Sequence, residues 1–351
     1  MSSAYQYYLA TLLVYFGSNT IACWALNLQY GISGVLNFSF ILFQAVGAYV
    51  TAIFTLGPST SSSYQSYIVG ARLPFPVPWL LAMVAGGLLS YLLALFVLRP
   101  ERRDFQAMVM LVVSIIAADV VITQKGLFNG HNGLAAIPKP FASEVGSELI
   151  RYGWFYVALT GATVVLTYLF VHRITSSPWA RQLRAMRDNS EALESLGVNV
   201  RTESTKVFVV GGALAALSGA VLVQFISAWS PGAWDTAETF LFFVAIIVGG
   251  AGNNAGAVLG AALVLGVFQE GLRYLPSFGY TGLAESIQFM GLGLLILAFL
   301  WWKPGGLIPE RRRTFGSAPG GIPPTSLPNG RPRFTVAGSL TRSLKRNRES
   351  T

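Results

Sequence analysis

The chain has 351 residues, of which 53% are hydrophobic and only 11% carry a charge, and its formal net charge is +9. Soluble domains carry about 25% charged residues, so the composition excludes a water-soluble globule and predicts a polytopic membrane protein. The positive charge does not indicate nucleic-acid binding here, because the arginines lie mostly at the ends of apolar segments and near the C-terminus.

Apolar segments recur along the first 310 residues. A helical span needs about 20 apolar residues, and fewer where a segment is broken inside protein. We expect an all-α fold with about nine spans, eight to ten being the range. The expected spans are residues 9–28, 36–56, 77–98, 105–124, 153–172, 207–228, 237–251, 256–272 and 283–302. The segments 237–251 and 256–272 are short and meet at a Gly/Asn cluster, which predicts a broken or partly re-entrant pair.

Basic residues gather after the third, fifth and last expected spans. They are Arg99, Arg102, Arg103, His172, Arg173, Arg181, Arg184, Arg187, Arg201, Lys206, Lys303 and Arg311 to Arg313. The positive-inside rule places these clusters in the cytoplasm, and nine crossings then leave the N-terminus outside and the C-terminus inside. The loops 57–76 and 125–152 are expected to face outward from the cell membrane, inner or plasma.

Residues 1–310 are expected to form one transmembrane domain with a cytoplasmic loop at 173–206. The remainder, 311–351, is rich in Pro, Gly, Ser, Thr and Arg. Such a composition cannot bury apolar surface, so this segment is predicted to be a basic, disordered, cytoplasmic tail.

The cytoplasmic loop carries the longest run of mixed charge before the tail. Residues 177–197 predict one amphipathic helix of about 19 residues. Ser177 suits the N-cap and Gly197 the left-handed position just past the end. An apolar stripe at helical spacing is formed by Leu183, Met186, Leu193 and Leu196.

The opposite face of this helix is expected to be charged. Arg184 with Asp188, and Arg187 with Glu191, stand four residues apart and are expected to pair across the surface. A short amphipathic helix of this kind can dock in a groove of a partner or lie flat on lipid. Its shape leaves both possibilities open.

The run RQLRAMRDNSEALESLGVNV resembles the "EAA…G" coupling-loop signature of ABC-importer permeases. Glu191 and Ala192 match its opening, Leu193 stands where the generic motif has a second alanine, and Gly197 matches its glycine. The flanking residues resemble branched-chain amino acid permeases, on the M-type, LivM-like side of that family. There the helix inserts into a cleft of a cytoplasmic ATPase. The resemblance therefore implies an ATPase-coupling role for Arg184, Arg187, Glu191, Ala192, Leu193 and Gly197.

Further stretches resemble the same family, and together they cover roughly residues 9–310. They are RRDFQAMVML (102–111), GHNGLAAIP (130–138), GGAGNNAGAVLGAAL (249–263) and KPGGL (303–307). Three positions depart from the family pattern. His131 replaces a glycine, Arg103 replaces a glycine, and Phe105 replaces a tyrosine.

The resemblance implies a permease subunit of an ATP-binding-cassette importer. Its solute would be a branched-chain amino acid or a related small polar molecule, such as another amino acid, urea or a short amide. The implied partners are cytoplasmic ATPase subunits, a second homologous permease forming a heterodimer, an extracytoplasmic solute-binding protein and membrane lipid, with no nucleic acid. Two alternatives stay open: a sugar or nucleoside permease of the same superfamily, and a stand-alone channel or secondary transporter.

Two apolar segments in corresponding halves are interrupted by glycine and small polar residues. Paired interruptions of this kind predict a transport path, although small residues also permit close helix packing. The first runs over 31–40 and the second over 249–256. The candidate path residues are Gly31, Gly34, Asn37, Ser39, Gly249, Gly250, Gly252, Asn253, Asn254 and Gly256.

Sites for enzyme chemistry are missing from the sequence. No lysine follows a glycine, so there is no G-K-[ST] phosphate loop, and ATP hydrolysis is expected on a separate ATPase subunit. His131 and His172 lack metal-ligand spacing, so we expect no metal, no cofactor bound by this chain and no catalytic residue. The intramembrane Asp119 is expected to make a structural hydrogen bond or to face a cavity.

Overall fold

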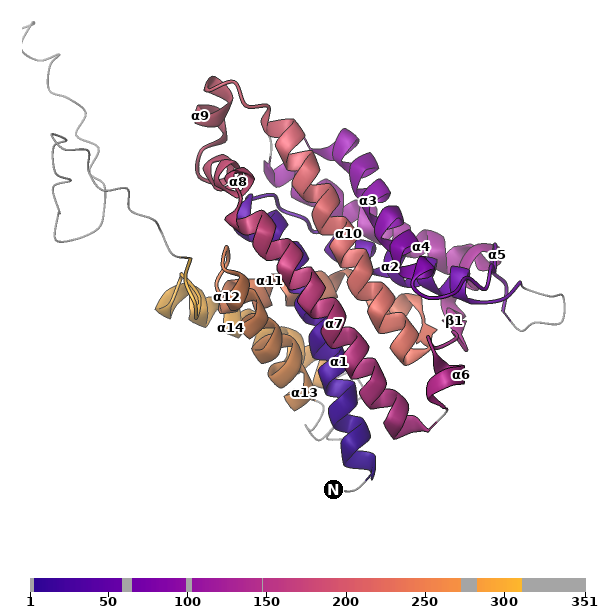
Figure 1. Ribbon diagram of the computed structural model, residues 1–351. Helices are drawn as coiled ribbons and strands as arrows, with labels where there is room; N and C mark the ends of the chain where they lie inside the picture. Colours follow the sequence, from indigo (N-terminus) through magenta and orange to yellow (C-terminus); the bar gives the residue numbers. More distant parts are fainter. Residues whose placement is uncertain (1–2, 59–64, 99–102, 147, 273–282, 311–351) are drawn as a thin grey trace, which may run out of the picture. The chain divides into compact units, whose positions relative to one another are not determined.

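The computed structural model describes residues 3–58, 65–98, 103–146, 148–272 and 283–310, and these fold into a bundle of α-helices (Figure 1). The predicted tail, 311–351, lies outside the described residues. The longer helices are α1 (Ser3–Leu26), α2 (Phe40–Thr55), α3 (Val77–Val97), α4 (Arg103–Thr123), α7 (Leu149–Ser176), α10 (Val200–Ile226), α11 (Thr236–Gly249) and α14 (Leu283–Trp302).

Shorter elements connect these helices. The short α-helices are α5 (Lys125–Phe128), α6 (Ala142–Val145), α8 (Pro178–Asp188), α9 (Ser190–Ser195), α12 (Asn254–Gly260) and α13 (Gln269–Leu272). Wider π-helical turns form η1 (Asn27–Ile32) and η4 (Ala261–Phe268), and 3-10 turns form η2 (Gly130–Asn132) and η3 (Pro231–Trp234). Strands β1 (Leu134–Ala135) and β2 (Ala228–Trp229) pair antiparallel.

Every predicted span coincides with an apolar helix, which confirms the all-α polytopic fold. Among the described residues, 5 helices are long and apolar enough to cross a membrane, and a second group of apolar helices, such as α2 and α11, has 10–17 residues each. The count of nine crossings stays a prediction. Several predicted ends are inaccurate. Helix α1 begins before its predicted span, and α7 and α10 extend beyond the apolar residues into polar turns at the loop that joins them.

Helix α10 lies at the centre of the bundle and packs against α1, α2 and α3. Its apolar window is 78% buried, whereas those of α3, α4 and α7 are 28%, 22% and 22% buried. Small residues allow this packing: a β-carbon at Gly219 would collide with the backbone of Gln44 in α2. The exposed apolar faces of α3, α4 and α7 suit contact with lipid, since water would not favour so much apolar surface.

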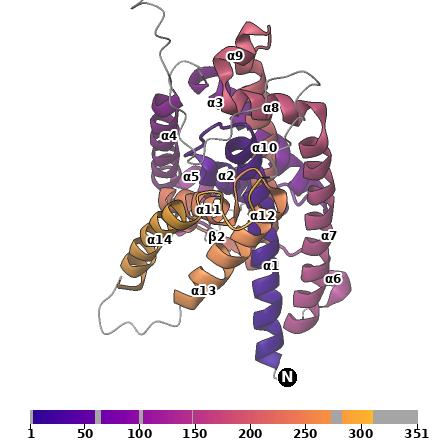
Figure 2. The same ribbon diagram turned by 90° about the vertical axis from the view of Figure 1, so that its left-hand side faces the viewer.

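The loop between α7 and α10, residues 177–199, is called the polar loop and lies at one end of the bundle. Helices α8 and α9 stand at the end opposite the N-terminus, and α1 and α7 run side by side between the two ends (Figures 1 and 2). The short pair α11 and α12–η4 packs together as a hairpin joined at residues 250–253. The predicted meeting of two short segments at the Gly/Asn cluster is therefore confirmed, and this turn lies near α8.

Candidate functional site

The polar loop contains two helices, so the prediction of one continuous helix over 177–197 was wrong. Ser177 caps α8 as predicted, since its Oγ accepts a hydrogen bond from the Ala180 amide at 3.4 Å. Asn189 then leaves the helical conformation, with φ −157° and ψ 100°. Its Oδ1 accepts from the Ala192 amide at 3.0 Å and so caps α9. An Asn side chain competes with the helix for backbone amides, which explains the break.

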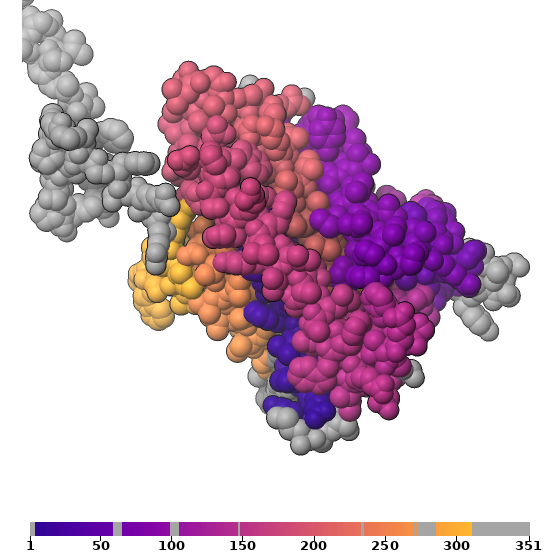
Figure 3. Space-filling model, viewed as in Figure 1, coloured from indigo at the N-terminus to yellow at the C-terminus, as the bar shows by residue number. Residues whose placement is uncertain are grey.

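The break also changes the apolar stripe. Leu183, Met186 and Leu193 are buried as predicted, but Leu196 is 80% exposed. The break at Asn189 interrupts the helical period of 3.6 residues. Leu196 therefore does not lie on the same face as Leu183 and Met186. Gly197 has φ +83°, so its predicted left-handed conformation is confirmed. The end of α9 thus presents an apolar side chain outward. In the space-filling view, α8 and α9 lie at the upper end of the described part of the molecule (Figure 3).

The two predicted arginine pairs on the outer face do not form. Arg184 and Arg187 turn inward and share one carboxylate, that of Glu310. Arg184 Nε lies 2.6 Å from Glu310 Oε1, and Arg187 Nη2 lies 2.8 Å from Glu310 Oε2. Arg187 also reaches Asp188 at 3.4 Å, an exposed contact that adds little. The arginines therefore hold α8 to the segment after α14.

The first interrupted segment, residues 31–40, is called the first glycine break and packs against the inner side of α8. Arg187 donates from Nη1 to the carbonyl oxygen of Gly31, the penultimate position of η1. The chain turns at Gly34, where φ is +75° and where a β-carbon would lie 2.8 Å from Arg187 Cγ. A side chain at this position would push the arginine away, so glycine permits both the turn and the contact with α8.

The second glycine break, residues 249–256, is bound by the segment 303–310 that follows α14. The amides of Leu307 and Ile308 donate to the carbonyl oxygens of Val248 and Gly249, at 2.8 and 2.9 Å. Glu310 follows two residues later, and its carboxylate lies beside Gly252. The same carboxylate that binds the two arginines is therefore fixed to the end of α11.

A polar joint connects the two breaks. Asn27 Oδ1 accepts from the Gly252 amide at 2.8 Å, and Asn27 Nδ2 donates to Asn254 Oδ1 at 3.4 Å. Asn254 in turn donates to Thr175 Oγ1 at the end of α7, at 3.0 Å, and Asn253 donates to the Pro309 carbonyl at 3.3 Å. Segments more than 200 residues apart thus meet through polar groups, and the bond between Asn27 and the Gly252 amide is buried, where an unpaired group would be costly.

The predicted path residues are mostly buried inside this joint and next to it. Asn37 donates to Gln29 Oε1 at 2.8 Å and accepts from the Ser39 hydroxyl at 2.8 Å. Gly249 and Gly256 pack against each other across the hairpin, and Gly250 packs against Gly306. Close helix packing through small residues is therefore present at both breaks. Contact of these residues with a passing solute stays a prediction.

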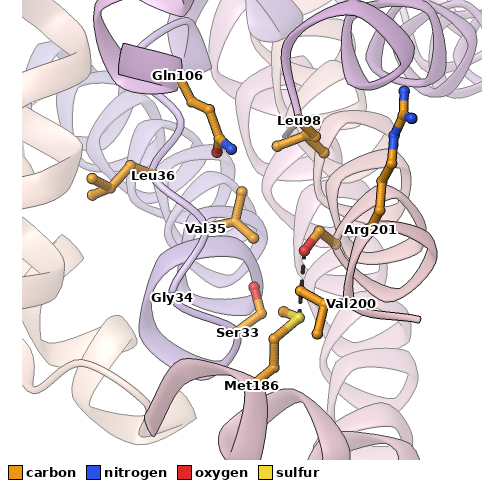
Figure 4. Close-up of a pocket in the computed structure, with 10 residues that line it drawn as sticks. Ser33, Gly34, Val35, Leu36, Leu98, Gln106, Met186, Val200 and Arg201 are labelled. Carbon is orange, nitrogen blue, oxygen red and sulfur yellow. Dashed lines mark hydrogen bonds between the residues drawn. The ribbon is translucent and has the colours of Figure 1, made fainter. Parts of the chain in front are cut away.

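A small cavity lies between α8 and the first break. Its volume is about 30 Å³. Its lining includes Ser33 and Gly34 from the break, Met186 from α8 and Gln106 from α4 (Figure 4). Met186 accepts a weak contact at Sδ from the Ser204 hydroxyl at 3.4 Å. The inner face of α8 is thus not fully packed beside the break.

Sequence reasoning missed Glu310, Asn27 and Thr175. Glu310 is the acidic residue between KPGGLIP and the triple arginine at 311–313, a signal that the basic cluster obscured. Asn27 and Thr175 gave no signal beyond being polar near span ends. Asp119 is exposed on α4, so its facing a cavity stays a prediction. Within the described ranges, no group of three His, Cys, Asp or Glu residues could hold a metal ion.

The bundle with its exposed apolar faces and a capped polar loop at one end defines a multi-pass membrane protein. The family model "Branched-chain amino acid transport system / permease component" matches residues 8–300. The chain belongs to this family of transport permeases.

Individual relatives agree with the family match. The probable branched-chain amino acid transport permease protein LivM of Methanocaldococcus jannaschii is 24% identical, over 86% of this chain and 94% of that protein. LivM of Escherichia coli K12 is 27% identical, over 82% of this chain and 67% of that protein. The fructose import permease protein FrcC of Rhizobium meliloti is 28% identical, but over only 44% and 40%. No solved structure matches this chain significantly.

Proposed function

We propose that this chain is a permease subunit of an ATP-driven importer and that the end of α9 is the surface that binds its ATPase. One observation carries the proposal: α9 ends in an exposed leucine, Leu196, beside the exposed Glu191, Ala192 and Gly197. An apolar anchor rimmed by polar residues is the usual form of a surface that inserts into a groove. A helix lying on lipid would need a continuous apolar face, and α8 and α9 instead bury theirs against the bundle.

The proposed solute is a branched-chain amino acid or a related small polar molecule. The relatives that align with most of this chain are named for branched-chain amino acids, and the sugar permeases align over less than half of it. A second, homologous permease would complete the path, and a solute-binding protein would deliver the solute at the end of the bundle opposite α9. In this arrangement α9 faces the cytoplasm of a cell with the chain in its plasma membrane.

The test is affinity purification of the full chain from its native membrane in mild detergent. Wild type is expected to bring an ATPase and a second permease with it. Leu196→Asp is expected to weaken ATPase binding by about tenfold or more, because loss of a buried anchor costs over ~1.4 kcal/mol. Glu191→Lys is expected to act in the same direction.

The matched control is Ile68→Asp, which places the same charge on an exposed apolar residue of an outer loop. It is expected to leave ATPase binding unchanged. A chain that purifies alone and moves solute into liposomes without ATP would instead be a channel or a secondary transporter, and the proposal would be wrong.

A further inference from the structure

The inner side of α8 is built differently from its outer side. Two arginines one helical turn apart bind the two oxygens of a single carboxylate, at 2.6 and 2.8 Å. The side chains of Arg184, Arg187 and Glu310 are 32%, 28% and 21% exposed, so the cluster is largely shielded from water. Shielded pairs with charge-assisted hydrogen bonds hold geometry far better than exposed pairs do.

Each member of this cluster is also attached to a different segment of the bundle. Arg187 donates to the Gly31 carbonyl at the first break, and Arg184 donates to the Thr175 carbonyl at the end of α7, at 3.4 Å. Glu310 belongs to the segment whose amides at 307 and 308 bind the second break. A displacement of α8 must therefore move both breaks, or the cluster must open.

The two breaks are suited to such a movement. Each is a change of direction at a glycine with positive φ, Gly34 at +75° and Gly252 at +83°, next to a π-helical turn or a short helix. Wide helical turns and glycine bends are common at positions that change shape in function. The cavity between α8 and residues 33–36 leaves room beside the first break.

We propose that Glu310 is a positioning residue for transport: together with Arg184 and Arg187 it transmits the displacement of α8 to the two glycine breaks. The proposal rests on the proposed function, because the ATPase would supply the displacement through α9. The cluster acts as a rigid link, so α8, the segment 307–310 and the breaks move together during the cycle.

The experiment uses the whole importer, purified with its ATPases and reconstituted in proteoliposomes, and measures solute taken up per ATP hydrolysed. In Glu310→Ala and in Glu310→Gln the ATPase is expected to stay bound and active. Uptake per ATP is expected to fall about tenfold, within the range of known coupling effects. The matched control is Asp188→Asn, which removes the exposed partner of Arg187 and should leave the ratio unchanged.

A rescue experiment separates transmission from mere support of the fold. The chain has a single cysteine, Cys23, and it is buried, so an introduced pair can be cross-linked selectively. The double variant Arg184→Cys/Glu310→Cys should lose coupling, and a short bismaleimide joining the two thiols should restore it. A support role would give no rescue.

Besides a failed rescue, two outcomes overturn the inference. One is an unchanged uptake-to-ATP ratio in both Glu310 variants; the other is release of the ATPase from those variants, which would make Glu310 part of docking. Neither outcome affects the proposed function, which is tested separately by purification of the wild-type chain and of Leu196→Asp.

Discussion

Helices α8 and α9 are neighbours in one loop, separated by Asn189 alone, yet α8 is bound to the bundle by ion pairs whereas α9 is mostly exposed. α8 is attached on its inner side through Arg184 and Arg187 to Glu310, Gly31 and the end of α7. α9 buries only Leu193, and its other residues face outward. A short loop can therefore combine a fixed part, suited to transmitting movement, with a free part, suited to recognition.

Substitution at the joint beneath α8 is expected to have the largest effect. Gly252 has φ +83°, and a β-carbon there would lie 2.7 Å from Glu310 Oε2 and 3.1 Å from Arg187 Nη1. Gly252→Ala combines a left-handed conformation, costing ~1–2 kcal/mol, with this collision. We expect a loss of stability of about 2 kcal/mol or more, seen as a lower melting temperature in mild detergent.

Gly161→Ala is the matched control for that substitution. Gly161 lies within α7, and a β-carbon there would meet no heavy atom within 4 Å. Alanine is the better helix former by up to ~1 kcal/mol, so this variant should melt at the same temperature as wild type or higher. Equal melting of the two variants would show that the joint is not strained by a side chain.

Substitutions at the end of α9 should lower solute uptake more than they lower the stability of the chain. A side chain at Gly197 would meet nothing within 4 Å, so Gly197→Val costs only the backbone conformation, about 1–2 kcal/mol. We expect the chain to remain in the membrane while uptake is lost. Gly197→Asn should retain uptake, because Asn tolerates the left-handed region. Normal uptake by Gly197→Val would remove the end of α9 from the docking role.

The smallest effect is expected on the outer face of α8. Arg181 is exposed there, one turn before Arg184. Arg181→Gln should change stability by less than about 0.5 kcal/mol, whereas Arg184→Gln loses a charge-assisted hydrogen bond and should cost about 1 kcal/mol. Thermal melting of the two variants compares them directly. Equal losses would contradict the distinction between the two faces.

Much of the fold followed from the sequence because it depends on composition and local pattern. Long apolar segments must form helices in a membrane, since backbone groups have no water to bind there, and every predicted segment is helical. The ends of the helices in the polar loop were also predictable from local sequence. Ser177 is an N-cap and Gly197 has a positive φ, as their side-chain chemistry favours. The family was also predicted correctly from short motifs.

Only the tertiary structure decided where the charges of the polar loop point. Spacing of four residues suggested that Arg184 and Arg187 pair within the helix, a contact worth ~0.5 kcal/mol or less. Glu310, over 120 residues away, offers a shielded carboxylate that binds both, and the shielded contact prevails over exposed ones. The joint at Asn27, Gly252 and Asn254 is of the same kind. Such partners are set by how distant segments pack, which no local pattern records.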